Sequence, residues 1–282
     1  MSAVDPTTTL GALVAERPAR AELFERLRLD YCCGGAQTLL EACSKRGLET
    51  DTIRAALETL DATSTGPKGL ESRDWRDASV VELCDHIVAV HHDGLRAAFP
   101  RIEALLSTVA RVHGSDHPEL FNLQTAFEQL RAELEPHLAS EESVLFPACV
   151  ALEREGVPVD EALLSEHERE HTDVGDGLAA LRVLARDYEP QSALCNTHRA
   201  LLDALAAFER DLHRHVHEEN NVLIPRMRDR DRRAEPALNH RKRLAPAVGP
   251  RDHASTEAPS LPRCCEAWLV EQTRAWRPAG SK

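Results

Sequence analysis

Two segments of the 282-residue chain repeat one arrangement of histidine, glutamate and apolar residues. The first begins at His137 and the second at His215. In each, a glutamate follows the histidine four residues later, and a valine, a leucine and a proline follow at matching distances. Residues four apart lie on one face of an α-helix, so each imidazole and its carboxylate can reach a common point. The repeat predicts two buried helices that each carry a pair of metal ligands.

A further histidine precedes each pair at nearly the same distance. His92 lies 45 residues before His137, and His171 lies 44 residues before His215. Apolar periodicity and turn residues divide this part of the chain into four long helices, at about 80–107, 119–152, 160–186 and 193–228. We expect them to form two helical hairpins or one four-helix bundle, with ligands in its core.

The number and type of these side chains indicate two metal ions. Four imidazoles and two carboxylates exceed the needs of a tetrahedral zinc ion, and no thiolate lies among them. Mixed nitrogen and oxygen ligation suits iron or manganese, and glutamates can bridge two ions. The predicted ligands are His92, His137, Glu141, His171, His215 and Glu219. An open di-iron site is the leading interpretation, and an ordinary bundle with core or surface histidines is the alternative.

Several other residues lie near the ligand stripe. His167 precedes His171 by four residues, so it is either a fifth imidazole ligand or a neighbour of one. Glu133 and Glu170 either relay protons and hold an imidazole in one tautomer, or lie on solvated helix surface. His86 and His91 fall off the ligand face of an α-helix, and we interpret each as a buried hydrogen-bonded or a solvated histidine.

The first sixty residues indicate a separate helical module, with short helices at about 10–18, 20–27, 37–46 and 52–60. Cys32 and Cys33 precede two glycines just before the third helix. Adjacent cysteines form only a strained ring, so we expect no disulfide between them. Thiols at a helix N-terminus have a lowered pKa, which suits redox exchange, metal capture or nitrosylation. Small buried residues in a tight glycine turn are the alternative.

The sequence Asp30-Tyr-Cys-Cys-Gly-Gly35, followed by these helices, resembles the RIC family (repair of iron centres; YtfE and ScdA type). Further shared motifs are Asp85-His86-Ile87, Leu145-Phe146-Pro147, Glu170-His171 and Glu219-Asn220-Asn221. The resemblance covers about residues 6–230. It implies an all-α fold in which a haemerythrin-like four-helix bundle follows a small helical domain of the ScdA N-terminal type.

The same resemblance implies a function. The family's ligands fall on the six predicted residues, with the two glutamates bridging two non-haem iron ions, and its acidic route to the metals falls on Glu133 and Glu170. It implies repair of iron-sulfur clusters damaged by nitrosative or oxidative stress, by iron donation, with Cys32 and Cys33 engaging the acceptor. His167 replaces a usually apolar residue, which moves the site toward the five-histidine pattern of oxygen-binding haemerythrins. A haemerythrin-like protein that binds O2 or NO, or reduces NO, is the alternative function.

Composition sets the remaining expectations. We expect a small domain at 1–62, a linker at 63–77, the bundle at 78–230 and a disordered tail at 231–282. The net charge of −13 argues against nucleic-acid binding. No apolar run approaches the ~20 residues of a membrane span, and the eight cysteines show no pairing framework. We expect a cytoplasmic protein whose partners are damaged iron-sulfur proteins, and a homodimer stays open.

Overall fold

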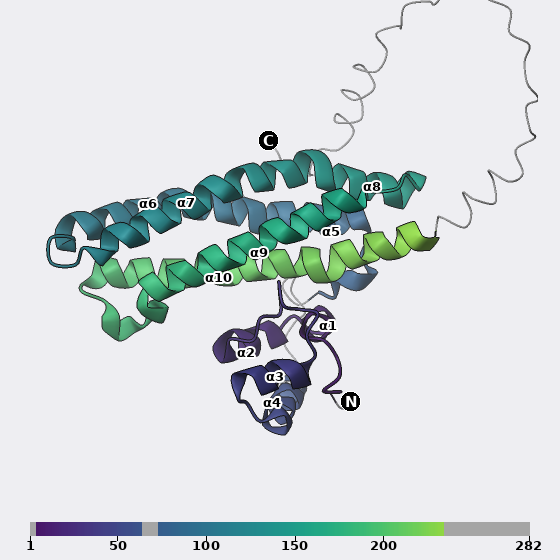
Figure 1. Cartoon of the computed structure of the whole chain (residues 1–282), viewed down its shortest axis with the longest axis horizontal. Helices are drawn as coiled ribbons and strands as arrows, with labels where there is room; N and C mark the ends of the chain where they lie inside the picture. Colours follow the sequence, from purple (N-terminus) through teal and green to yellow (C-terminus); the bar gives the residue numbers. More distant parts are fainter. Residues whose placement is uncertain (1–3, 64–72, 234–282) are drawn as a thin grey trace, which may run out of the picture.

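The computed structural model describes residues 4–63 and 73–233. Of the predicted disordered tail at 231–282, residues 231–233 are helical, and the part from 234 onward lies outside the described residues. In the described part of the chain the elements are helical, and one isolated bridge joins Thr9 to Thr38. Figure 1 shows long helices side by side, with a group of short helices against one side of them. The predicted all-α class, a bundle preceded by a small helical region, is confirmed.

The bundle consists of four helical rods (Figure 1). The first rod consists of α5 (Val80–His86), η3 (Ile87–His92) and α6 (Asp93–His113). The second rod consists of α7 (Glu119–Ser140), η4 (Glu141–Leu145) and α8 (Phe146–Glu155). The last two are α9 (Glu161–Leu184) and α10 (Asn196–Glu218), the latter continued by η7 (Glu219–Leu223) and a helix at 224–233. The short turns η5 (Arg186–Tyr188) and η6 (Pro190–Ser192) connect α9 to α10.

Local sequence determines where these rods begin and end. Ser79 and Glu82 form a capping box, in which each side chain accepts a hydrogen bond from the other's backbone N–H, at the start of α5. Asp160 caps α9 by accepting from the N–H of Ala162. Gly156 ends α8 in the left-handed conformation, with a φ of 70°, which glycine adopts without strain. Gly156 is also one of the turn residues that divide the predicted rods, and the end observed at Glu155 is close to the one predicted from it.

Three of the four rods contain a π-helical segment, which α-helical periodicity does not predict. They are η3, η4 and η7. His92 ends η3, Glu141 begins η4 and Glu219 begins η7, so each segment carries a predicted ligand. In a π-helix the hydrogen bond spans five residues instead of four, so the turn is wider and the side chains around it are redirected. The segments therefore change the direction of side chains where the ligands lie.

The predicted ligands separate two apolar clusters in the bundle core. One cluster contains a residue of each rod on one side of the ligands: Leu95, Leu138, Val174 and Val216. The other contains the corresponding residues on the opposite side: Val88, Leu145, Leu164 and Val222. The polar side chains thus form a layer enclosed between apolar ones, where few waters screen their charges.

The N-terminal module comprises α1 (Leu10–Glu16), α2 (Arg20–Leu27), α3 (Leu39–Arg46) and α4 (Thr50–Thr63). It has its own apolar core, which includes Phe24, Leu39 and Leu57. Arg20 is buried and forms an ion pair with Asp61 at 2.6 Å, which joins α2 to α4. A separate core agrees with the module expected from the sequence.

The end of the predicted linker contributes to the bundle. Residues Trp75–Asp77 form the short turn η2, and Trp75 is buried in the bundle core. The bundle core therefore includes a residue that precedes the predicted boundary at residue 78. None of the helices in 4–63 or 73–233 is long and apolar enough to cross a membrane.

Candidate metal centre

Seven buried side chains from all four rods meet in the polar layer of the bundle. They are His92, His137, Glu141, His167, His171, His215 and Glu219. All six ligands predicted from the repeat are among them, and His167 is the seventh. Their ligand atoms fall into two groups that could each hold a metal ion, and Glu141 belongs to both groups.

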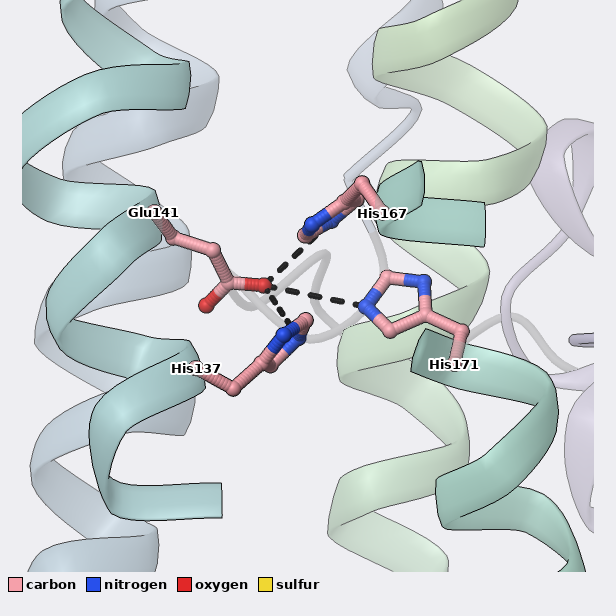
Figure 2. A group of neighbouring side chains, drawn as sticks. All are labelled: His137, Glu141, His167 and His171. Atoms are coloured by element: carbon pink, nitrogen blue, oxygen red, sulfur yellow. Dashed lines mark ion pairs between the residues drawn. The ribbon is translucent and has the colours of Figure 1, made fainter. Parts of the chain in front are cut away.

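The first group surrounds one oxygen of Glu141. Figure 2 shows three imidazoles, from α7 and α9, pointing toward this oxygen. The distances to Glu141 Oε1 are 2.8 Å from His137 Nε2, 3.3 Å from His167 Nε2 and 3.6 Å from His171 Nε2. His167 therefore lies among the imidazoles of this group rather than behind them.

The second group surrounds the other oxygen of the same carboxylate. Glu141 Oε2 lies 3.1 Å from His92 Nε2 and 3.7 Å from His215 Nε2. Glu219 is shared in the same way: its Oε2 lies 2.7 Å from His167 Nε2, and its Oε1 lies 3.2 Å from His215 Nε2. Each carboxylate thus presents one oxygen to each group, which is the arrangement expected of two ions that share bridging ligands.

Several of these atoms have no hydrogen-bond partner although they are buried. They include both oxygens of Glu141 and the Nε2 atoms of His137 and His171. His137 Nε2 is only 2.8 Å from Glu141 Oε1, but the two are not oriented to form a hydrogen bond. A buried polar atom left without a partner costs about 1–3 kcal/mol. Metal ions between these atoms would satisfy them, so the residues present fit a di-metal site.

Three imidazoles are oriented by oxygen atoms behind them. The Nδ1–H group of His92 donates a hydrogen bond to Glu142 at 2.7 Å, and that of His137 donates to Glu170 at 2.8 Å. The Nδ1–H group of His171 donates to the side-chain oxygen of Asn220 at 2.8 Å. A proton on Nδ1 leaves the Nε2 lone pair free to face the centre. These contacts therefore select the tautomer that binds a metal.

The charges of the centre are mutually dependent. Burial raises the pKa values of Glu141 and Glu219, but the surrounding imidazoles outweigh burial and hold both pKa values well below the usual range. Conversely, burial lowers the pKa of His171, but the carboxylates of Glu141 and Glu219 beside it raise it to about 10. Without metal, the two carboxylates are thus anions neutralised by protonated imidazoles, and they are suited to bind cations instead.

Comparisons with known proteins agree with this geometry. A family model described as the hemerythrin HHE cation binding domain matches residues 83–227, and the ScdA N-terminal model, described as a domain of unknown function (DUF542), matches residues 6–61. Two relatives are named iron-sulfur cluster repair protein YtfE. The one from Pectobacterium carotovorum subsp. carotovorum (strain PC1) is 34% identical to this chain over 219 residues, and the one from Dickeya chrysanthemi (strain Ech1591) is 36% identical over 220 residues. Each alignment covers 77% of this chain and 95% of the relative.

The chain belongs to the YtfE family of haemerythrin-domain proteins. The predicted resemblance is therefore confirmed. The family assignment agrees with a di-metal site built on a shared Glu141 in the haemerythrin-like region.

The two predicted acidic residues differ in position in this YtfE-family bundle. Glu170 contacts the centre through His137, and its side chain is 43% exposed, so it links the centre to solvent. Glu133 lies exposed on α7, and within the described residues it forms no hydrogen bond or ion pair. The structure brings only Glu170 to the metal centre.

The Cys32–Cys33 pair does not lie at a helix N-terminus, and that prediction is wrong. Helix α3 begins only at Leu39, because Thr38 and Glu41 form its capping box, and the cysteines lie in the turn before it. Both are free thiols. Cys32 is buried, while Cys33 is partly exposed and contacts helix α9 of the bundle.

Sequence reasoning did not identify Glu142 and Asn220 as partners of the imidazoles. Both directly follow a glutamate of the repeat, Glu141 in one case and Glu219 in the other. A polar residue at the same position of both repeats was therefore a usable signal. The α-helical interpretation concealed it, because the π-helical segments η4 and η7 direct these residues toward the neighbouring rods.

Proposed function

We propose that the chain binds two iron ions at this centre and uses them to repair iron-sulfur clusters damaged by nitrosative or oxidative stress. The observation that carries the proposal is that the two oxygens of Glu141 face separate groups of imidazoles. The activity comes from the relatives, which are named iron-sulfur cluster repair proteins. The proposed partners are damaged iron-sulfur proteins in the cytoplasm.

We assign the ligands from the two groups of side chains. His137, His167 and His171 would hold one ion, His92 and His215 would hold the other, and the carboxylates of Glu141 and Glu219 would serve both. Imidazole and carboxylate ligands suit iron, whereas a site for Cu(I) would contain thiolates or thioethers. Two ferrous ions supply electrons and open coordination positions for O2 or NO.

The inequality of the two groups supports iron donation. The group at His92 and His215 has two imidazoles, whereas the other group has three. The ion with fewer protein ligands is held less tightly, and we propose that it is the one donated. Glu170 provides a proton path, because it accepts a hydrogen bond from His137 and reaches solvent. Cys33, which is partly exposed, is proposed to engage the acceptor.

The test uses protein loaded anaerobically with an iron isotope tracer and an aconitase whose cluster has been damaged by NO. We expect wild type to restore aconitase activity and the tracer to appear in the repaired cluster. Glu141→Ala, which lacks the shared carboxylate, should do neither, while the control His198→Gln, at the opposite end of α10, should act like wild type. Equal repair by Glu141→Ala and wild type would contradict the proposal.

A second function is favoured by one observation, the position of His167. Its Nε2 lies 2.7 Å from Glu219 and 3.3 Å from Glu141, so the centre contains five imidazoles and two carboxylates. That number is the one expected of oxygen-binding haemerythrins, and it supports binding of O2 or NO at a centre that retains its iron. Optical spectra of the ferrous protein with added O2 and NO test it. A reversible O2 band that His167→Leu abolishes, without tracer transfer to aconitase, would favour this function over repair.

A further inference from the structure

A second cluster of potential metal ligands lies beside the di-metal centre and takes no part in it. His86 is on α5, His91 is on η3 and Glu218 is the last residue of α10. Glu218 Oε2 lies 3.4 Å from His86 Nε2 and 3.7 Å from His91 Nε2, and the three ligand atoms all lie within 4.8 Å of one another. All three side chains are at least 85% buried.

The π-helical segment η3 explains why these two histidines come together. His86 and His91 are five residues apart, and on an α-helix that spacing turns them to different faces. In a π-helix residues five apart are joined by one hydrogen-bonded turn, so they lie nearly above each other. Their rings are 5.6 Å apart and almost perpendicular.

Neighbouring residues are divided between the two clusters. His92 faces the di-metal centre while His91 faces the second cluster, and Glu219 and Glu218 divide in the same way. Each cluster therefore has its own imidazoles and its own carboxylate. A ligand bound at the second cluster would not have to take a protein ligand from the first.

Two buried atoms of the second cluster lack hydrogen-bond partners. They are His91 Nε2 and Glu218 Oε2, and they face each other across 3.7 Å, which is too long for a hydrogen bond. A buried carboxylate oxygen that makes no hydrogen bond is unfavourable, and a cation bound between this oxygen and the two imidazoles would satisfy it. The di-metal centre shows the same feature at His137, His171 and Glu141.

The surroundings of this cluster also resemble those of a metal site. Asp211 accepts a hydrogen bond from His91 Nδ1 at 2.8 Å, which leaves the Nε2 lone pair of His91 directed into the cluster. Trp75 stacks on the His86 ring, with centroids 4.1 Å apart and planes 28° apart. One imidazole is thus fixed by a carboxylate and the other by an indole, and both are held in position before any ion binds.

We infer that His86, His91 and Glu218 bind one divalent first-row transition-metal ion, separate from the two ions of the bundle centre. Two imidazoles and one carboxylate are a ligand set that such ions accept, with further positions left for water. The inference depends on the geometry of these three residues and not on the proposed repair activity. The contrary interpretation is a network of hydrogen bonds that shares protons without metal.

Cobalt(II) is the probe, because it accepts these ligands. Protein carrying two iron ions per chain is dialysed against Co2+, and iron and cobalt are counted by elemental analysis. We expect one cobalt per chain in addition to the two irons. His86→Gln and Glu218→Gln should each weaken cobalt binding at least about tenfold, since even an outer contact of a ligand is worth that much. The matched control His198→Gln should bind cobalt like wild type.

The iron count of each variant shows whether it retains the main centre. If either variant also loses iron, the position of the bound cobalt is determined instead in crystals of the wild-type protein, from anomalous scattering at the cobalt edge. A cobalt peak between His86, His91 and Glu218 supports the inference. No third metal ion, a peak at another position, or unchanged cobalt binding in both iron-retaining variants would overturn it.

Discussion

The thiol of Cys33 donates a hydrogen bond to the backbone carbonyl of His171, with sulfur and oxygen 3.3 Å apart. His171 is part of the candidate metal centre, so the cysteine turn of the N-terminal module lies directly against a ligand-bearing helix. Asn221 strengthens this contact, since its amide donates to the carbonyls of Cys32 at 2.9 Å and Tyr31 at 3.3 Å. The cysteine turn and the metal centre are therefore structurally coupled.

The two adjacent thiols should react at different rates. The hydrogen bond from Cys32 lowers the pKa of Cys33 below the ordinary value, whereas that bond and burial raise the pKa of Cys32 well above it. Because the thiolate is the nucleophile, Cys33 should be alkylated by iodoacetamide first, with a rate that rises with pH through a midpoint below 9. Mass spectrometry of the labelled peptides measures the order. Equal labelling of both thiols would contradict it, and Cys33→Ser should abolish the fast phase.

Removing the shared carboxylate should affect both ions. Glu141 presents an oxygen to each group of imidazoles, so Glu141→Ala should reduce bound iron from two per chain toward none. Elemental analysis of protein loaded anaerobically measures this. The matched control is Glu135→Gln on the same rod, whose exposed carboxylate forms an ion pair with Arg131. Two irons in Glu141→Ala would show that the carboxylate is not a ligand.

The residue that orients His137 should affect metal affinity without being a ligand. Glu170→Gln weakens the acceptor of the His137 Nδ1 proton, and loss of such a contact typically costs about 10–100-fold in metal affinity. The rate of iron release to a ferrous chelator measures the effect. The control Glu166→Gln, on the exposed side of α9, should release iron like wild type. Release at the wild-type rate from Glu170→Gln would remove this role.

Replacing glycine by alanine should have opposite effects at Gly35, which lies in the contact between the two modules, and at Gly94, which lies within the bundle. A Cβ at Gly35 would lie 2.2 Å from the Asn221 side-chain oxygen and 2.7 Å from the Tyr31 carbonyl, so Gly35→Ala should destabilise the fold by about 1–3 kcal/mol. At Gly94, inside α6, the nearest atom is 3.5 Å away, and Gly94→Ala should stabilise by roughly 0.4–1 kcal/mol. Denaturant unfolding measures both, and a neutral Gly35→Ala would contradict the observed contact.

Much of the fold could be predicted because its signals are local. The capping box at Ser79, the cap at Asp160 and the glycine at 156 mark helix ends within a few residues of the chain. The repeat of histidine and glutamate also identified six side chains of the centre, since a spacing of four residues needs only α-helical geometry.

The remaining features depend on geometry that the sequence pattern does not contain. The azimuths of an α-helix place His86 and His91 off the ligand face, whereas the π-helical segment η3 brings them together with Glu218. Cys32 and Cys33 were expected at a helix N-terminus, but their position is fixed by Asn221, nearly two hundred residues later in the chain. Contacts between distant segments decide such positions, and a single sequence carries no signal for them.

The most direct test of the central claim is anomalous diffraction at the iron edge from crystals of the ferrous protein. The account predicts two iron peaks in the bundle, one on each side of the Glu141 carboxylate, with His137, His167 and His171 around one and His92 and His215 around the other. A single peak, or iron bound away from Glu141, would contradict it.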